Sequence, residues 1–517
     1  MSIRVEPDPA ITAVAIEEKK KLQKNFRRFD IFFFLICTLV GVDTIGTVAN
    51  TGAQGFTWLV FVGILFFVPY GLIVAEIGSA FTEEGGCYVW TQYAFGYFIA
   101  AVNTVIYWVS VPIWVGGSLA ITALKAADTF FAPIPGFWRY VFALAFIVFS
   151  VGAAILSFRI GKWIPIVGAW ARFLVLSFFT FSVVLYAFRN GLHGFTGHGF
   201  LPTYAVFIAA VPAIVYNYVG FELPNSAGDE MTDPQRDVPF TVALSAVGTI
   251  LLYGAPILAI LLVLPKDRIT SLGGFLDAIK AVFTVYGGHI DAKGAVTLLG
   301  AGKVLGACAA LLFILSLASS GTTWLMGGDR VLAVAGYSGA GPRILGTFSA
   351  RFGTPIVANL LSGFIAMVVM VLAFALSHGN TDKYFSAVLN LAISTTTISY
   401  LAIFPAAIQL RYTHPDRPRP YRIPFGNAGV WVCGLLATFW TLVATIVLLW
   451  PGLGVGWFHT AGDPDSSLPA GFAHERWQYE WTQILPLVVV ILVGILFYFV
   501  GRKNREQSLL STHHTIE

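Results

Sequence analysis

Long apolar stretches recur along the whole chain of 517 residues, and they constrain its fold more than any other feature. Each stretch is long enough to cross about 30 Å of hydrocarbon as a helix. Because hydrocarbon offers no hydrogen-bond partners, each crossing backbone must satisfy its polar groups within the helix. The sequence therefore predicts an all-α polytopic membrane protein with about 12 spans, near residues 31–53, 56–81, 98–126, 138–157, 163–187, 202–228, 239–264, 300–333, 355–377, 384–410, 428–450 and 483–500.

Charged residues are scarce, and this scarcity excludes most soluble classes of protein. Asp, Glu, Lys and Arg make up 11% of the chain, whereas soluble domains carry roughly 25%. So much apolar surface does not fit inside water-soluble cores, which excludes a cytosolic enzyme and a nucleic-acid binder. No GxxxxGKS/T loop is present, so we do not expect an ATP-driven pump. The four cysteines are scattered, and we expect no disulfide framework, metal or cofactor.

Lys and Arg are distributed unevenly between the loops, which predicts the orientation of the chain. With the N-terminus inside, about 20 basic residues fall on cytoplasmic segments and about 10 on the other side, as the positive-inside bias requires. We predict a multi-pass protein of the plasma (inner) membrane, with membrane lipid around it and both termini cytoplasmic. Its parts are a tail at 1–30, a core at 31–410 with halves at about 31–187 and 202–410, a connector at 411–427, two further spans within 428–500, and a tail at 501–517.

Two of the predicted spans are interrupted. The first reads ICTLVGVDTIGTVANTGAQG, with four glycines and the charged Asp43 near mid-depth, and the sixth reads VPAIVYNYVGFELPNSAGDE. Glycine weakens a helix and proline removes a backbone donor, so both spans are expected to unwind there. Unwound backbone within a membrane survives only where it lines a cavity or is buried in protein. Paired breaks five spans apart indicate an inverted-repeat transporter with its site between the repeats.

Four motifs on the predicted cytoplasmic side resemble those of the amino acid–polyamine–organocation permeases. They are AEIGSAFTEEGGCYVWTQYAFG (75–96), GFELPNSAGDEMTDPQRDVP (220–239), GGDRVLAVAGYSGAGP (327–342) and PDRPRPYRIP (415–424). The first departs from the family pattern at Thr82, where proline is usual. The resemblance implies a LeuT-type architecture, in which spans 1–5 and 6–10 are inverted repeats followed by two extra helices. It also implies secondary active transport of amino acids or related amines by alternating access, with spans 1, 3, 6 and 8 around the substrate.

Asp43 is the most informative candidate residue, because an acid in the middle of a membrane span costs about 3 kcal/mol on insertion scales. We weigh three roles for it: pairing with a substrate ammonium, carrying a coupled proton, or capping the half-helix that restarts after the break. Backbone amides freed at the break would form a cradle for a substrate carboxylate. We therefore place the neighbouring residues Thr44, Ile45, Gly46 and Thr47 in the substrate site. The family usually carries a second glycine where this chain has Val48.

The break in span 6 is expected to offer hydrogen-bond acceptors, where the break in span 1 offers donors. Its freed carbonyls, from Asn217 to Gly220, could accept hydrogen bonds from a substrate ammonium. Tyr218 stands where family members carry an aromatic beside the substrate, so we expect an occluding gate there, with Phe221 as the second choice. Simple packing of both rings against spans 1 and 8 is the competing interpretation. Glu222 follows the break, and it could cap the second half-helix, bind substrate or carry a proton.

Two further charges lie near the predicted site. Arg172 lies well inside span 5, where the resemblance suggests a built-in cation in place of bound sodium. Its expected partners are hydroxyls near Ser319, Ser320 and Thr322 of span 8. Snorkelling of Arg172 toward the cytoplasm is the alternative. Glu76, near the end of span 2, resembles the family's Glu-Leu/Ile-Gly element and suggests an inner-gate or scaffold role.

Small and polar residues on spans 3 and 8 complete the expected site. We place Trp114, Ser319 and Thr322 at the cavity, although close packing of membrane helices would select the same residue types. If Arg172 replaces sodium, proton-driven import or exchange is favoured. Two alternatives to an amino acid permease stay open, namely a polyamine or cationic amine transporter of the same fold and an amino acid sensor that does not transport.

Overall fold

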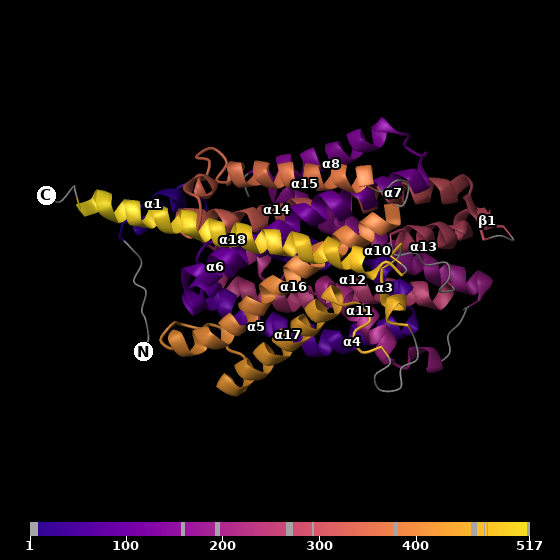
Figure 1. Cartoon of the computed structure of the whole chain (residues 1–517). Helices are drawn as coiled ribbons and strands as arrows, with labels where there is room; N and C mark the ends of the chain where they lie inside the picture. Colours follow the sequence, from indigo (N-terminus) through magenta and orange to yellow (C-terminus); the bar gives the residue numbers. More distant parts are fainter. Residues whose placement is uncertain are drawn as a thin grey trace.

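The structure is a computed structural model, and it describes residues 9–156, 161–191, 197–264, 272–291, 294–376, 381–455, 463–469, 471–472 and 474–513. The long helices run side by side in one bundle (Figure 1). Helix α1 (Pro9–Lys19) and the last turns of α18 (Arg476–His513) lie at one end, which we call the α1 end. Strand β1 (Gly288–Ile290) lies at the opposite end.

Almost all of the described chain is helical, with π or 3₁₀ turns marked η. The elements between α1 and α18 are α2 (Arg28–Leu39), α3 (Ile45–Asn50), α4 (Ala53–Val62), η1 (Gly63–Phe67), α5 (Val68–Ala80), α6 (Cys87–Trp114), η2 (Val115–Leu119), α7 (Ala120–Phe130), α8 (Phe137–Ile155), α10 (Trp163–Asn190), η3 (Gly197–Phe200), α11 (Tyr204–Asn217), η4 (Leu223–Glu230), α12 (Pro234–Val263), α13 (Gly274–Val282), η6 (Phe283–Tyr286), β1, β2 (Val296–Leu298), α14 (Gly300–Tyr337), η7 (Arg343–Gly346), α15 (Ile356–Leu376), α16 (Thr381–Thr413), α17 (Gly426–Leu449) and η9 (Pro464–Ser467).

Within the described residues, 10 helical segments are long and apolar enough to cross a membrane. Two are composite, α4–η1–α5 and α6–η2–α7, and the others are α8, α10, α12, α14, α15, α16, α17 and α18. They correspond to every predicted span except the first and the sixth. The all-α polytopic fold is therefore confirmed, while the inverted repeat stays a prediction.

The first and sixth spans are interrupted as predicted. Helix α2 ends at Leu39 and α3 begins at Ile45, so residues 40–44 are not helical. Helix α11 ends at Asn217, and only the 3₁₀ turn η4 follows at Leu223. Gly220 between them has a φ of 129°, a backbone conformation that glycine adopts without strain.

The two breaks lie against each other in the bundle. The Thr38 hydroxyl, at the end of α2, donates to the carbonyl of Gly220 over 3.3 Å. The indole of Trp324 on α14 donates to the Thr38 carbonyl over 3.4 Å. Segments some 180 residues apart in the chain thus meet beside α14, which is the arrangement expected of a site between spans 1, 6 and 8.

Several element boundaries differ from the sequence expectation. Span 3 begins at Cys87, earlier than the predicted residue 98, because the helix continues across a kink at Gly96, whose φ is 83°. Between the seventh and eighth predicted spans, the structure contains α13 and an antiparallel hairpin of β1 and β2, with His289 opposite Thr297. Helix α18 continues beyond the predicted end at residue 500. Residues 456–462, 470 and 473 between α17 and α18, and residues 1–8 and 514–517 of the tails, lie outside the described residues.

Candidate substrate and coupling site

Asp43 lies in the break of span 1, and its side chain faces span 3. The residue is 3% exposed. Its Oδ2 accepts a hydrogen bond from the indole of Trp114 over 2.9 Å and another from Ser118 over 3.1 Å. Its Oδ1 is buried and accepts no hydrogen bond from any described residue. The side chain makes no capping bond to α3, so the capping role does not match this geometry.

The residues after Asp43 start the short helix α3. The Thr44 hydroxyl donates to the Gly41 carbonyl over 2.9 Å and makes a short contact with the hydroxyl of Tyr253 on α12. Ile45 and Gly46 are buried in the first turn of α3, and Thr47 follows, partly buried. The structure therefore places all four predicted neighbours beside the break.

Aromatic rings from three helices surround the two breaks. Trp114 of α6 meets Trp324 of α14 edge-to-face, with ring centroids 6.2 Å apart, and it meets Tyr216 of α11 at 6.5 Å. Tyr107 lies 6.5 Å from Trp324. A Cβ added at Gly220 would lie 3.3 Å from the Trp324 ring, so this ring covers the break of span 6. Sequence reasoning missed Trp324, which falls one helical turn after Ser320 and could have been placed on the same face.

Tyr218 and Phe221 contact residues of span 2. The Tyr218 hydroxyl donates to the Leu59 carbonyl of α4 over 2.9 Å, and its ring stacks on Phe67 with centroids 4.6 Å apart. Phe221 stacks on the other side of the same ring at 4.7 Å. In this arrangement both rings pack against span 2, whereas the competing interpretation has them packing against spans 1 and 8. A gate at either position stays a prediction, and it would require the ring to leave Phe67.

Asn217 is the last helical residue before the break in span 6. Its side chain is 5% exposed, and neither its Oδ1 nor its Nδ2 has a hydrogen-bond partner among the described residues. A buried polar group left unpaired costs about 1–3 kcal/mol. Asn217 therefore has one acceptor and one donor group available to a ligand at the break.

Glu222 is held by three tyrosines. Its Oε1 accepts hydrogen bonds from Tyr107 over 2.7 Å and Tyr400 over 2.6 Å, and its Oε2 accepts a short one from Tyr70. The Tyr70 hydroxyl in turn accepts the backbone N–H groups of Gly220 and Phe221. The carboxylate, 1% exposed, thus joins span 6 to spans 2, 3 and 10. It makes no capping bond to η4, and the three tyrosines come from separate helices that no spacing rule connects.

Arg172 is fully buried and reaches across to spans 1 and 8. Its Nε donates to the Val40 carbonyl at the break over 3.0 Å, and its Nη1 donates to Ser319 over 2.8 Å. Its Nη2 donates to the Ser316 carbonyl over 2.6 Å and to Ser320 by a short contact. These contacts exclude the snorkelling interpretation. The Thr322 hydroxyl instead donates to the carbonyl of Ser150 on α8, so Thr322 packs the span and does not contact Arg172.

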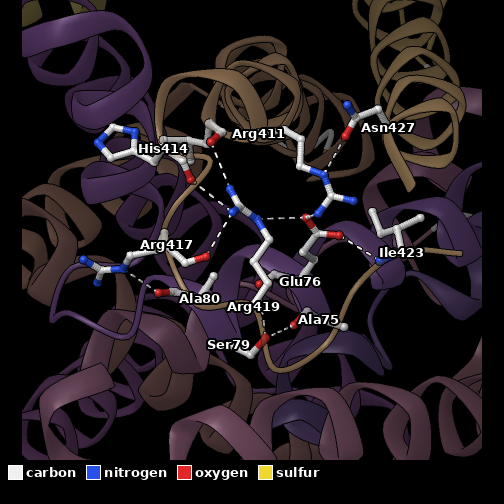
Figure 2. A network of polar contacts seen from close by, with 11 residues as sticks. Ala75, Glu76, Ser79, Ala80, Arg411, His414, Arg417, Arg419, Ile423 and Asn427 are labelled. Atoms are coloured by element: carbon white, nitrogen blue, oxygen red, sulfur yellow. Dashed lines mark hydrogen bonds and ion pairs between the residues drawn. The ribbon is translucent and has the colours of Figure 1, made fainter. Parts of the chain in front are cut away.

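Glu76 lies away from the breaks, near the end of α5, and it anchors the connector after α16. Its Oε1 pairs with Arg411 and, over 3.2 Å, with Arg419. Its Oε2 accepts the backbone N–H of Ile423 over 2.8 Å. Figure 2 shows Arg417 beside them, donating to the Ala80 carbonyl over 2.9 Å. These contacts describe a scaffold, and Glu76 does not reach the substrate site.

Comparison with known proteins decides the family. The sequence model of the family described as Amino acid permease matches residues 26–461. The chain belongs to the amino acid permease family. It is 25% identical over 434 residues to the "Probable agmatine/putrescine antiporter AguD" of Lactococcus lactis, covering 83% of this chain and 87% of that protein. It is 23% identical over 497 residues to the "b(0,+)-type amino acid transporter 1" of Mus musculus, covering 93% and 88%.

Solved structures agree on the fold. A manganese transporter of Eremococcus coleocola superposes with a TM-score of 0.57, covering 93% of this chain and 94% of that one at 12% identity, which shows the fold alone. No group of three or more His, Cys, Asp or Glu side chains that could hold a metal ion occurs within the described residues. By its family and its relatives, this permease is a multi-pass membrane protein and a secondary transporter, and not an enzyme.

Proposed function

We propose that this permease moves an organic cation, an amine or an amino acid with a cationic group, across the plasma membrane by alternating access about the two breaks. The observation that carries the proposal is the Asp43 carboxylate, buried in the break of span 1 with an Oδ1 that accepts no hydrogen bond from the described residues. A buried carboxylate of this kind requires a counter-charge or a proton. The buried Arg172 guanidinium acts on Asp43 electrostatically but forms no salt bridge with it among the described residues, and a substrate ammonium supplies the direct counter-charge.

The aromatic rings support a cationic substrate. A cation over the face of an indole is attracted by about 0.5–2 kcal/mol, and more strongly where water is excluded. Trp114 hydrogen-bonds Asp43 and packs edge-to-face on Trp324, so a carboxylate and two indoles lie together at the breaks. The amide of Asn217 adds polar contacts for a second substrate group.

The relatives support the same class of substrate. One is named for agmatine and putrescine and the other for amino acids, and both classes carry an ammonium group. A neutral amino acid, whose ammonium would meet Asp43 and whose carboxylate would meet the amides of α3, is the second candidate. The amide N–H groups of Ile45 and Gly46 in the first turn of α3 favour it.

Arg172 supports transport without sodium. Its guanidinium stays protonated at any physiological pH, and it already occupies the carbonyl and hydroxyl oxygens between spans 1, 5 and 8. Those oxygens are the ligands that a hard cation would need. Transport is then driven by a coupled proton or by exchange of one substrate for another. Glu222 is the candidate proton carrier.

Reconstituted vesicles test the proposal. Purified protein is first screened for thermal stabilisation by diamines, agmatine, cationic amino acids and neutral amino acids, because a ligand that binds only the folded state raises its apparent stability. Stabilising ligands are then offered as labelled substrates to proteoliposomes. Uptake of a cationic substrate supports the proposal. Uptake of neutral amino acids alone supports the second candidate, and binding without uptake supports the non-transporting sensor.

A further inference from the structure

Two buried carboxylates meet a single guanidinium at the α1 end of the bundle. Arg330 of α14 lies 3.4 Å from the Oε1 of Glu84 and 2.8 Å from the Oε1 of Glu230. The three side chains are 0%, 0% and 4% exposed. Glu84 belongs to the turn between α5 and α6, and Glu230 is the last residue of η4. The cluster therefore joins spans 2, 3, 6 and 8 at one end.

The backbone ties the same segments together. The Glu84 Oε2 accepts the N–H of Asp229 over 3.1 Å, and the Glu84 N–H donates to the Asp229 carboxylate over 3.4 Å. The N–H of Phe26, in the segment before α2, donates to the Glu230 carbonyl over 3.0 Å. Opening the bundle at this end would pull these segments apart.

The charges in the cluster do not balance. In the described part of the chain, Arg330 is the one cation that pairs with Glu84 and Glu230, which leaves one buried negative charge in excess. Asp229 has its own partner, Lys19, at 2.9 Å. The Glu84 Oε1 accepts no hydrogen bond from the described residues, although it is buried. The other titratable groups that face Glu84 are Asp229 of η4 and Tyr337 of α14.

We propose that Glu84, Glu230 and Arg330 form a proton-binding lock, in which the Glu84 carboxylate takes up one proton when the α1 end of the transporter closes. The proton comes from water on the side of the membrane that the α1 end faces. It forms an O–H bond at the Glu84 carboxylate, and it returns to the same water when the end opens and the carboxylate is hydrated again. The atom that carries it is Oε1, which lies 3.4 Å from Arg330 and accepts no hydrogen bond from the described residues.

The electrostatics of the cluster determine how pH changes the balance between the closed and open states of the α1 end. Burial, and after it the nearby Glu230 carboxylate, raise the pKa of Glu84 well above its usual range. Burial also raises the pKa of Glu230, although Arg330 opposes the shift. A group whose pKa is raised in the closed state stabilises closure at pH values below that raised pKa, and the contribution is lost as pH rises through it. Higher pH on the α1 side therefore favours opening, by at most about tenfold per pH unit for one proton.

Infrared spectroscopy of the purified protein tests the lock without transport. At neutral pH the wild type should show the carbonyl stretch of a protonated carboxylic acid that disappears in Glu84→Gln and returns in Glu84→Asp. Glu83→Gln is the matched control, because Glu83 lies next in the chain and pairs with Arg417 outside the lock. A spectrum in which Glu84→Gln removes no protonated acid overturns the proposal.

Vesicle flux gives the second readout, and here the inference rests on transport by alternating access. Efflux in wild type and Glu83→Gln should rise as pH rises on the α1 side, and efflux in Glu84→Gln should be flat. A slope retained in Glu84→Gln overturns the lock. If Glu84→Gln does not fold, Glu230→Gln leaves one carboxylate per guanidinium and should abolish the same infrared band. A protein that shows the infrared band of the protonated acid but moves no substrate at any pH contradicts the proposed function and does not contradict the lock.

Discussion

The carboxylate of Asp43 accepts a hydrogen bond from the indole of Trp114, 2.9 Å away, which joins the break of span 1 to the middle of span 3. This contact orients a buried charge by its Oδ2 and leaves Oδ1 for a ligand. It is the most specific link between the fold and the proposed substrate, because it explains how an unpaired acid is held inside a membrane protein.

Replacing Trp114 by phenylalanine should weaken substrate binding. The change removes the indole N–H and leaves only Ser118 to orient Oδ2. Loss of one hydrogen bond to a buried charged group costs about 1.5–3 kcal/mol, so we expect KM for a cationic substrate to rise by roughly tenfold to a hundredfold. Trp138→Phe, on an exposed ring, is the control. An unchanged KM would contradict the role given to Trp114.

Transport by the wild type should not depend on sodium. Because the Arg172 guanidinium occupies the oxygens between spans 1, 5 and 8, replacing external sodium by choline should leave uptake within twofold. The measurement is initial uptake into proteoliposomes at fixed pH and membrane potential. Arg172→Gln leaves buried acceptors unpaired, and its melting temperature should fall. A sodium requirement in the wild type would contradict the role of Arg172.

Glu222→Gln should separate exchange from proton-driven uptake. Glutamine keeps an oxygen for the tyrosine hydroxyls of Tyr107 and Tyr400 but cannot lose or gain a proton. We expect accumulation driven by a pH gradient to disappear while substrate exchange continues. Tyr400→Phe is the companion variant, since it removes the Tyr400 hydrogen bonds to Glu222 and Tyr70 and keeps the carboxylate. Gradient-driven accumulation that survives in Glu222→Gln would assign the proton to another group.

Glu76→Gln should destabilise the fold without changing substrate affinity. Glu76 is 3% exposed and Arg419 is 4% exposed, and breaking a buried pair by removing one partner costs about 3–5 kcal/mol. The melting temperature should therefore fall, with KM unchanged in the folded fraction. Glu83→Gln, which breaks a half-exposed pair, should change stability by less than about 1 kcal/mol. A selective rise in KM would show that the connector acts on the substrate site.

The sequence carried enough information to predict the breaks and two partners of Arg172, Ser319 and Ser320, whereas the predicted Thr322 donates to Ser150 instead. Gly41 and Gly220 interrupt periodic apolar segments, and this pattern is visible without any tertiary contact. Arg172 and the serines of span 8 are polar residues in apolar runs, which makes them conspicuous. The direction of Tyr218 and Phe221 was not predictable, because it depends on the backbone dihedral angles of Gly220, whose φ is 129°.

Contacts that form only through tertiary structure could not be predicted from the sequence either. Tyr70, Tyr107 and Tyr400 are single aromatics on three apolar helices, and nothing in their spacing connects them to Glu222. Trp324 lies in a run of small residues as an apparent packing side chain. For Glu84 and Arg330, the motifs that contain them predicted the family but not the charge imbalance between them.

Uptake of a labelled cationic substrate by Asp43→Asn is the most direct test of the central claim. Asparagine keeps the shape of the side chain and an acceptor for Trp114 but removes the negative charge. The matched control is Asp128→Asn, at the end of α7, whose carboxylate pairs with Arg139. The account predicts loss of cationic substrate uptake in Asp43→Asn, with normal expression and normal uptake in Asp128→Asn. Unchanged kinetics for every transported substrate in Asp43→Asn would contradict it.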